Sequence, residues 1–391
     1  MDLRTMILGM ELDTILFLIG MMTLVGVLKD LGLFTWLIQS IINARNMNGY
    51  KFIVILMLLS GVMPGFVDEV TSIVFVLALV FQVCDTLKLK PTPFVIMSVI
   101  ATNIGSTGTM LGNPVGILVG KHAGLSFGDF IEHATPVMLL SLAVTLLILM
   151  VWYRKDIALL NTRLLEHRAE SRGLGPLVKI PYKRSLVIML VSVAFIASHH
   201  GIESALGLSP NTMLICAPLT IAGVLMLYRS RRARHYIERE VEWWTLLFFM
   251  MLFAVASALS ATGVTGLVAD RFMAAFGTSK YVLTPLIIGV TAIGSAFVDN
   301  IVFVASFIPI IKKIVLEHPE LQPLWWALLF GSCYGGNITA IGSTANIVAL
   351  GMLEKHSGAR IGFFEWLKVG LFAGFVTCAV ATLVILVFYF K

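Results

Sequence analysis

The sequence predicts an all-α polytopic membrane protein built from two inverted-topology repeats, each with a re-entrant hairpin and a broken transmembrane helix. Composition supports the membrane part of this prediction. Of the 391 residues, 58% are hydrophobic and 13% are charged, against roughly 25% charged residues in a soluble domain. A helix of about 20 residues crosses the hydrocarbon core of a bilayer. Six stretches hold at least 20 uncharged residues each, namely 93–120, 134–153, 205–228, 243–269, 321–353 and 369–390.

An internal duplication supports the repeat part of the prediction. The tripeptide Phe66-Val67-Asp68 recurs as Phe297-Val298-Asp299, 231 positions later, and Gly32 matches Gly263 at the same offset. After one deletion the offset becomes 230, and residues 107–112 then match residues 337–342 through a shared Thr-x-x-Gly pattern. A nearly constant offset over about 100 residues indicates duplication rather than chance similarity between apolar segments.

Each repeat is expected to contain the same elements in the same order. A long helix comes first, then a short apolar stretch, an acid-tipped hairpin, a long segment interrupted by polar residues, and a last span. In the first repeat (1–153) these are residues 14–28, 33–42, 52–84, 93–120 and 134–153. In the second repeat (241–391) they are residues 243–260, 265–276, 281–311, 324–352 and 369–390.

The two hairpins are predicted to be re-entrant. Their apolar arms, predicted as 52–67, 70–84, 281–298 and 300–311, mostly fall short of the ~20 residues that a full crossing needs. Pro64-Gly65 and Gly294 weaken the helix close to each tip, as a turn requires. We therefore expect both tips to lie near the middle of the membrane.

Charge predicts the orientation. A helix, a re-entrant hairpin, a broken helix and a last helix make three crossings, so the second repeat starts from the opposite side. Eight Lys/Arg residues lie in the loop 154–184 and five lie in 229–239, which by the positive-inside rule places the loops 154–184 and 229–240 in the cytoplasm. A central helical pair and its basic loop (185–240) join the repeats. We expect a multi-pass protein of the cell (inner or plasma) membrane whose environment is the lipid bilayer, with no nucleic-acid partner.

Three acids are flanked on both sides by long apolar runs: Asp68, Glu69 and Asp299. A central Asp costs about 2.5 to 3.5 kcal/mol on insertion scales, so a functional role is expected. Such a carboxylate can exchange a proton for a cation, which is the minimal chemistry of coupled transport. The alternative is structural, because an Asp at a helix N-terminus caps free backbone N–H groups. Asp68 and Asp299 are equivalent by symmetry, whereas Glu69 aligns with Asn300.

The interrupted helices are the second candidate for a site. Residues 103–114 and 335–346 break apolar helices with Gly, Asn, Ser and Thr at equivalent places. Broken helices at matching positions in inverted halves indicate the substrate site of a transporter, since freed N–H groups suit an anion and freed oxygens suit Na⁺. The alternative is that small residues only permit close helix packing.

Several of these motifs resemble those of the ArsB/NhaD family of the ion transporter superfamily. They are Asp13-Thr-Ile-Leu-Phe-Leu-Ile-Gly-Met-Met with Gly32-Leu-Phe, Phe66-Val-Asp-Glu-Val-Thr71 with Phe297-Val-Asp-Asn300, Asn103-Ile-Gly with Leu-Gly-Asn-Pro114, and the segment 335–346. The family includes arsenite efflux pumps, Na⁺/H⁺ antiporters, silicon exporters and the melanosomal P protein. The resemblance implies a homodimer with a scaffold domain and a transport domain that moves like an elevator.

The resemblance also implies a set of site residues. Coupling falls to Asp68, Asp299 and Glu69, although the family usually has Asp-Asn where this chain has Asp68-Glu69, which puts a carried-over role for Glu69 in doubt. A Na⁺ site is expected at Asp68, Asn113, Asp299 and Asn346. Substrate or ion binding is expected at Thr71, Asn103, Thr107, Thr109, Gly112, Asn113, Asn300, Asn337, Thr339, Gly342, Ser343, Thr344 and Asn346.

The function expected from these observations is a secondary active transporter. The main hypothesis is an efflux antiporter that uses a proton or sodium gradient to move arsenite or another small oxyanion or oxyacid. The alternatives are an Na⁺/H⁺ antiporter of the NhaD type and a passive anion channel. No HExxH motif is present, and we do not expect an enzyme. We expect no cofactor other than Na⁺.

Overall fold

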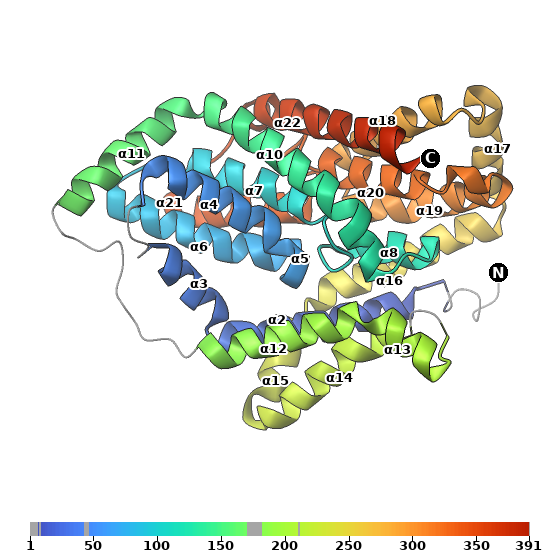
Figure 1. Cartoon of the computed structure of the whole chain (residues 1–391), viewed down its shortest axis with the longest axis horizontal. Helices are drawn as coiled ribbons and strands as arrows, with labels where there is room; N and C mark the ends of the chain where they lie inside the picture. The colour runs from blue at the N-terminus through green and yellow to red at the C-terminus, as the bar shows by residue number, and fades with distance from the viewer. Residues whose placement is uncertain (1–6, 8, 43–46, 170–181, 210–211, 391) are drawn as a thin grey trace.

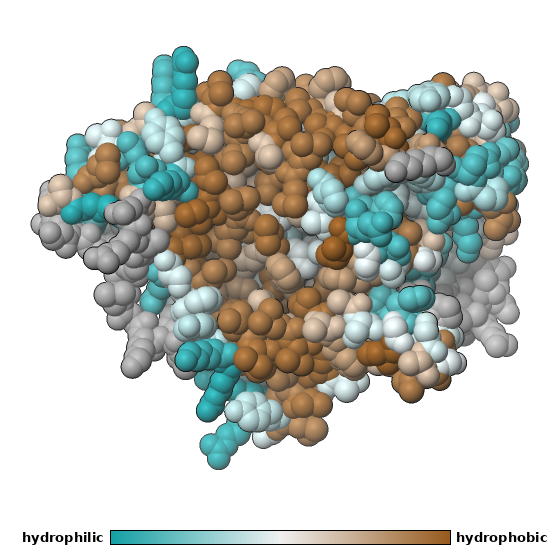
Figure 2. Space-filling view, viewed as in Figure 1, coloured by the Kyte–Doolittle hydropathy of each residue, from teal (hydrophilic) through white to brown (hydrophobic). Residues whose placement is uncertain are grey.

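The computed structural model describes residues 7, 9–42, 47–169, 182–209 and 212–390. This part of the chain consists of helices and the turns between them, and it contains no strand. Seven of its helices are long and apolar enough to cross a membrane, or up to nine if each of two bent helix pairs is one span. Figure 2 shows hydrophobic residues over the middle of one face and hydrophilic residues gathered towards its two ends. This distribution suits a protein whose middle lies in the apolar part of a bilayer.

The first repeat follows the predicted order of elements. The first helix and the short apolar helix precede the hairpin, and the broken helix and the last helix follow it. These elements are α2 (Leu12–Asp30), α3 (Leu33–Ile42), α4 (Gly49–Val62), α5 (Pro64–Val67), α6 (Glu69–Leu87), α7 (Thr92–Gly105), α8 (Pro114–Ala123), α9 (Phe127–Asp129), η1 (Phe130–Ala134) and α10 (Thr135–Trp152).

The second repeat has the same order. Its hairpin consists of α18 and α19, and its broken helix consists of α20 and α21. The elements are α16 (Trp243–Ala261), α17 (Val264–Phe276), α18 (Lys280–Phe297), α19 (Asn300–Glu317), η4 (Pro319–Leu321), α20 (Leu324–Gly335), α21 (Thr344–Ser357), α22 (Phe363–Val384) and η5 (Ile385–Tyr389).

The segment between the repeats is more helical than expected. α11 (Arg154–Ala169) occupies the first half of the predicted loop 154–184, and residues 170–181 lie outside the described residues. Ile157, Leu160 and Leu164 recur at helical spacing and are buried, so α11 has an apolar face within a charged segment. The elements that follow are α12 (Tyr182–Ala197), α13 (His199–Leu206), α14 (Thr212–Tyr228), η2 (Ser230–Arg232), α15 (Ala233–His235) and η3 (Tyr236–Glu240).

Three of the four hairpin arms are longer than the sequence predicted, and α18 has the predicted length. The first hairpin has two stretches of 19 residues, Gly49–Val67 and Glu69–Leu87, and α18 and α19 have 18 residues each. The apolar run in α19 ends before Lys312, but the helix continues to Glu317 with charged side chains. Arm length alone therefore does not distinguish a re-entrant hairpin from two full crossings.

The arrangement in space supports the inverted, re-entrant interpretation. In Figure 1, the first hairpin lies towards one end of the molecule with α7 and α21, and the second lies towards the other end with α8 and α20. Contacts agree, because α21 packs against α6 and α7, whereas α8 packs against α19 and α20. Each broken helix thus reaches from one end to the other, and the two hairpins enter from opposite ends.

The helix breaks form where local chemistry predicts them. In the first break, Pro114 starts α8, and Asn113 caps it by accepting a 2.8 Å hydrogen bond from the Gly116 amide. In the second break, the Ser343 hydroxyl accepts a 3.2 Å hydrogen bond from the Ala345 amide at the start of α21. Asn and Ser are preferred N-cap residues, so both breaks lie within the predicted ranges 103–114 and 335–346.

Small residues allow α4 and α7 to approach closely beside the first break. A Cβ atom added to Gly105 would lie 1.8 Å from the carbonyl oxygen of Gly61. No side chain can be accommodated at that distance, so the last turn of α7 depends on this glycine for its position.

We predict that Gly105→Ala destabilises the protein, because forcing atoms into a packed contact costs about 1–3 kcal/mol. Gly289→Ala is the matched control, since a Cβ at this helical glycine in α18 would meet no heavy atom within 4 Å. Thermal unfolding of the purified variants in detergent measures the effect. Equal midpoints for the two variants would contradict the close approach of α4 and α7.

Candidate functional site

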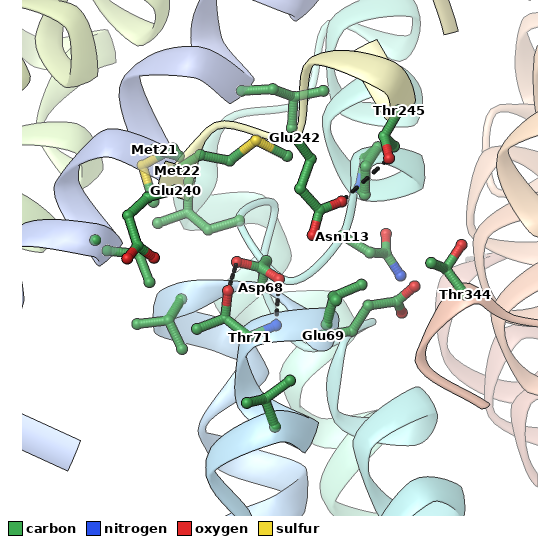
Figure 3. A pocket seen from close by; sticks show the side chains of 18 of the residues that line it. Met21, Met22, Asp68, Glu69, Thr71, Asn113, Glu240, Glu242, Thr245 and Thr344 are labelled. Atoms are coloured by element: carbon green, nitrogen blue, oxygen red, sulfur yellow. Dashed lines mark hydrogen bonds between the residues drawn. The ribbon is translucent and has the colours of Figure 1, made fainter. Parts of the chain in front are cut away.

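A cavity of about 230 Å³ is lined by residues 67–71 of the first tip, by the end of the first break, and by Ile301 and Thr344 of the second hairpin and broken helix, whereas Asp299 does not line it. It lies between the N-terminal ends of α6, α8 and α21 on one side and α2 and residues 239–249 on the other. Five of the residues predicted from the sequence line it, namely Asp68, Glu69, Thr71, Asn113 and Thr344. Figure 3 shows Glu69, Asn113 and Thr344 converging on one side of this cavity.

The first tip is a strained turn held by its own aspartate. Asp68 has φ 90° and ψ 160°, a conformation that residues other than glycine rarely adopt and that costs roughly 1–3 kcal/mol. Its carboxylate accepts hydrogen bonds from the backbone amide and the hydroxyl of Thr71, both at 2.8 Å. Asp68 therefore caps the N-terminus of α6, as the structural alternative predicted. Its carboxylate nevertheless faces the cavity.

The aspartate of the second tip accepts hydrogen bonds from two different helices. Asp299 caps α19 by accepting a hydrogen bond from the Ile301 amide at 3.0 Å, and its other oxygen accepts one from the Thr344 hydroxyl at 2.9 Å. The neighbouring Ser343 hydroxyl donates to Glu69 at 3.5 Å. Two consecutive residues of the second break therefore contact acids of both tips, which brings the two tips into one polar centre.

Glu69 and its symmetry mate both leave a buried oxygen without a partner. Glu69 is 3% exposed and Asn300, 231 positions later, is 2% exposed. Within the described part of the chain, Glu69 Oε2 and Asn300 Oδ1 accept no hydrogen bond. Buried acceptors without a donor are uncommon and call for an explanation. A proton on the carboxylate or a bound cation would satisfy oxygens of this kind.

Asn103 joins the two repeats behind the cavity. Its amide nitrogen donates to the side-chain oxygens of Asn337 and Asn346, both at 2.8 Å. Asn346 in turn donates to the carbonyls of Gly336 and Thr339 at 2.8 and 2.9 Å. These amides fix the course of the second break, and Asn346 lies in this network rather than among the residues that line the cavity.

Cys333 takes the place of Asn103 in the other half. It stands 230 positions after Asn103, and its sulfur accepts a 3.1 Å hydrogen bond from Asn113, which also donates to Ser106 at 2.7 Å. The first half of each broken helix thus reaches the second half of the other. Cys333 and Ser106 were not among the predicted site residues, although the repeat offset marks Cys333.

Several predicted site residues build the walls of the centre. Thr109 donates to the carbonyl of Gly65 at 2.9 Å, and Thr339 donates to the carbonyl of Ala296, so equivalent hydroxyls fasten equivalent tips. Thr107 donates to the carbonyl of Ile104 at 2.8 Å. Gly112 and Gly342 allow the breaks to fold tightly, because a Cβ there would lie 2.1 Å from the Ser106 carbonyl oxygen and 2.8 Å from that of Gly336.

Two further acids line the cavity that sequence reasoning missed. Glu242 precedes α16 and points into the cavity, where it accepts a 3.1 Å hydrogen bond from Thr245 (Figure 3). Glu240 pairs with Lys29 at 2.9 Å. Glu240 was counted with the predicted cytoplasmic loop 229–240, and Glu242 lies between that loop and the predicted helix 243–260. The two basic residues in the lining, Lys29 and Arg239, belong to the ends of α2 and η3.

Comparison with known proteins agrees with this architecture. A sequence profile of the citrate transporter family (CitMHS) matches residues 1–331. An uncharacterized transporter of Mycobacterium tuberculosis is 32% identical over 392 residues, covering 98% of this chain and 87% of that protein. The human P protein is 26% identical over 450 residues, covering 96% of this chain and 53% of that protein, so this chain spans about half its length.

The fold also matches a solved structure. The crystal structure of the Alcanivorax borkumensis YdaH transporter has a TM-score of 0.61 with this chain at 15% identity, over 97% of this chain and 86% of that one. Together with the all-helical architecture, this likeness confirms the predicted fold class.

We predict that Asn103→Ala destabilises the protein, because it leaves the buried side-chain oxygens of Asn337 and Asn346 without their donor, at about 1–3 kcal/mol for each orphaned group. Thr102→Val is the control from the same helix, since the Thr102 hydroxyl is buried and has no hydrogen-bond partner in the described structure. Chemical or thermal unfolding in detergent compares the two. A Thr102→Val loss as large as that of Asn103→Ala would exclude the network as the cause.

Proposed function

Because this chain belongs to the citrate transporter family and is a multi-pass membrane transporter, we propose that it is a secondary active transporter driven by a proton or sodium gradient. The solute that we propose is a small oxyacid or oxyanion, with arsenite as the first candidate and efflux as the direction. The observation that carries the proposal is the contact of Ser343 and Thr344 with acids of both tips, Glu69 and Asp299. Such a centre can take up and release a cation while it moves against the remaining helices.

The charged side chains that line the cavity limit which solutes the protein can transport. Asp68, Glu69, Glu240 and Glu242 line the cavity against Lys29 and Arg239, and the tip acids form no ion pair within the described residues. An unaccompanied anion would be repelled, since like charges at short range destabilise each other. A neutral oxyacid, such as protonated arsenite, or an anion accompanied by a cation fits better. The family description adds citrate to the solutes that need testing.

The coupling cation is proposed to bind at the tips. Asp68, Asp299 and Glu69 supply carboxylates, and the unpartnered oxygens of Glu69 and Asn300 supply further acceptors. Asn113 lines the cavity, but its side-chain oxygen already caps α8. The proposal covers both Na⁺ and H⁺ as the coupling cation, because the same oxygens can bind either one.

The second candidate function is Na⁺/H⁺ antiport of the NhaD type. The specific observation in its favour is the group of carboxylates at the tips: Asp68 and Glu69 line the cavity, and Asp299 bonds to Thr344 in the lining. Such carboxylates suffice for cation exchange without any further solute. Kinship with the ArsB/NhaD permeases is part of the same proposal. A passive anion channel is less favoured, because an acid-lined cavity disfavours anions.

Movement of the elevator type fits the packing. Asn103 and Asn113 join the two broken helices to each other. Hydrogen bonds from the breaks to both tips join the hairpins to them, so these elements can move as one body. We propose that this body moves against the remaining helices within a homodimer in the cell membrane, with loops 154–184 and 229–240 in the cytoplasm. The cavity, which includes Arg239 and Glu240, then opens inward.

The test is transport by the purified protein in proteoliposomes with an imposed pH or Na⁺ gradient. We predict that arsenite, citrate or Na⁺ accumulates against its own gradient, and that an ionophore that collapses the driving gradient stops the accumulation. We expect Asp299→Asn to abolish coupled transport with the fold retained, because the carboxylate that contacts Thr344 is lost.

Asp270→Asn is the matched control, since Asp270 is a surface carboxylate of the same repeat that pairs with Lys313. Movement of every solute only down its own gradient would refute active transport and favour a channel. Accumulation of Na⁺ alone would favour the second candidate. Wild-type rates in Asp299→Asn would remove Asp299 from coupling.

A further inference from the structure

A second cavity of about 190 Å³ lies at the other ends of the helices that line the first. The first cavity reaches Lys29 at the end of α2 and Thr245 at the start of α16. The second has Glu11 at the start of α2 and Ser260 at the end of α16. α8 and α19 follow the same rule, with their first turns beside the first cavity and their last turns beside the second. The two cavities therefore face opposite ends of the molecule.

The two cavities are equivalent by the internal repeat. Of the twelve residues that line the second, seven stand 231 positions from a residue that lines the first. Three such pairs are Glu242 with Glu11, Val25 with Ala256, and Val74 with Ala305. Random placement of two cavities would not reproduce the offset that relates the repeats. The second cavity is thus the inverted copy of the first.

The two cavities differ in whether they reach the hairpin tip of their own repeat. The first cavity includes residues 67–71 of the first tip, whereas the equivalent residues of the second tip, 298–302, do not line the second cavity. Ile301 instead faces the first cavity. In this conformation the polar centre is open towards the first cavity and closed towards the second.

Ion pairs join α2 to α8 at the second cavity, whereas the equivalent helices at the first cavity, α16 and α21, share none among the described residues. The ion pair at the first cavity, Lys29 with Glu240, joins α2 to η3 instead. Lys121 at the end of α8 pairs with Glu11 and Asp13 at the start of α2, and His122 lies 3.4 Å from Glu11. At the repeat offset, Lys121 and His122 correspond to Gly351 and Met352, which carry no charge. Within the described residues, Glu242, the mate of Glu11, makes no ion pair and bonds only to Thr245.

Glu11 and Lys121 are both charged at neutral pH. Burial disfavours the charge of Glu11, but its hydrogen bonds and ion pairs with His122 and Lys121 outweigh burial and lower its pKa to about 2. Burial also disfavours the charge of Lys121, but the hydrogen bonds and charges of Asp13 and Glu11 raise its pKa, so the pair of Glu11 and Lys121 between α2 and α8 is ionised. If α8 moves with the broken helices while α2 stays in place, these pairs must break.

We propose that the second cavity is the vestibule through which solute and cation reach the polar centre from the opposite face, and that the Glu11, Asp13, Lys121 and His122 cluster latches it shut. This inference rests on the proposed function, since it assigns the second access path of alternating access. The path suits small hydrophilic solutes, because Ser257, Ser260 and Lys312 line it beside Glu11.

Thiol labelling in membrane vesicles of both orientations tests the proposal. Ser257→Cys reports on the second cavity and Met22→Cys on the first, each in a background without the native cysteines. The probe is the small, cationic, membrane-impermeant reagent MTSET. We expect Met22→Cys to react from the face that carries residues 229–240 and Ser257→Cys to react slowly and only from the opposite face.

Removing the latch should reverse this preference. We expect Lys121→Gln, and separately Glu11→Gln, to raise the labelling rate of Ser257→Cys by roughly three- to tenfold and to lower that of Met22→Cys, because loss of an ion pair shifts a two-state equilibrium by about that factor. Lys313→Gln is the control, since it breaks the pair of Lys313 with Asp270 at the same end, away from the cavity lining. It should change neither rate.

Two outcomes would overturn the proposal. Unchanged rates in both latch variants would show that the cluster does not hold the cavity closed. Reaction of Ser257→Cys from the same face as Met22→Cys would show that the second cavity is no vestibule of the opposite side. Labelling requires no transported solute, so a failure of gradient-driven transport would refute the proposed function without deciding this result.

Discussion

The structure depends on one constraint: polar backbone and carboxylates in the apolar interior of a membrane need partners from within the protein. The second break meets this need for both halves. Ser343 and Thr344 stand on consecutive positions at the start of α21, and their hydroxyls reach Glu69 of one tip and Asp299 of the other. Neither hairpin could keep its acid at this depth if the other half moved away. The helix breaks and the tips therefore form a single unit.

Duplication explains how such a centre can be assembled from two similar sequences. Thr109 and Thr339 donate hydrogen bonds to the carbonyls of Gly65 and Ala296, so the same interaction stabilises both tips. The two repeats nevertheless differ at equivalent positions in the polar centre. Asn103 is replaced by Cys333, and Glu69 is replaced by Asn300, so the first repeat supplies one more carboxylate to the centre and the second an amide and a thiol. The two cavities also differ, because Lys121 and His122 at the second correspond to the uncharged Gly351 and Met352 in the other repeat.

Much of the fold could be predicted from the sequence because its signals are local. Apolar runs, the acidic tips and the loop-forming residues of each break mark the elements, and Asn113 and Ser343 cap helices inside the predicted breaks. α11 was missed because its apolar face is hidden among charges, and the arm 300–311 was predicted too short because charged residues extend α19 beyond the apolar run.

The site was predicted in part, for a physical reason. Residue type shows which side chains can bind an ion, but not which of them the protein uses for its own structure. Thr107, Thr109, Asn337 and Thr339 were predicted as ligands and lie in the walls, with hydroxyl or amide groups bonded to the chain. Glu242 was missed because only the folded chain brings the start of α16 to the cavity.

The claim that both halves form one ion-binding site is tested most directly by a double-mutant cycle on the apparent affinity for the coupling cation. Glu69→Gln changes the first tip, and Thr344→Val removes the hydroxyl that bonds to the second. A shared site predicts that the two effects are coupled by more than about 0.5 kcal/mol, as for groups in one network. Effects that add within roughly 0.3–0.5 kcal/mol would mean that the two tips bind independently, which would contradict a single ion-binding centre shared by both halves.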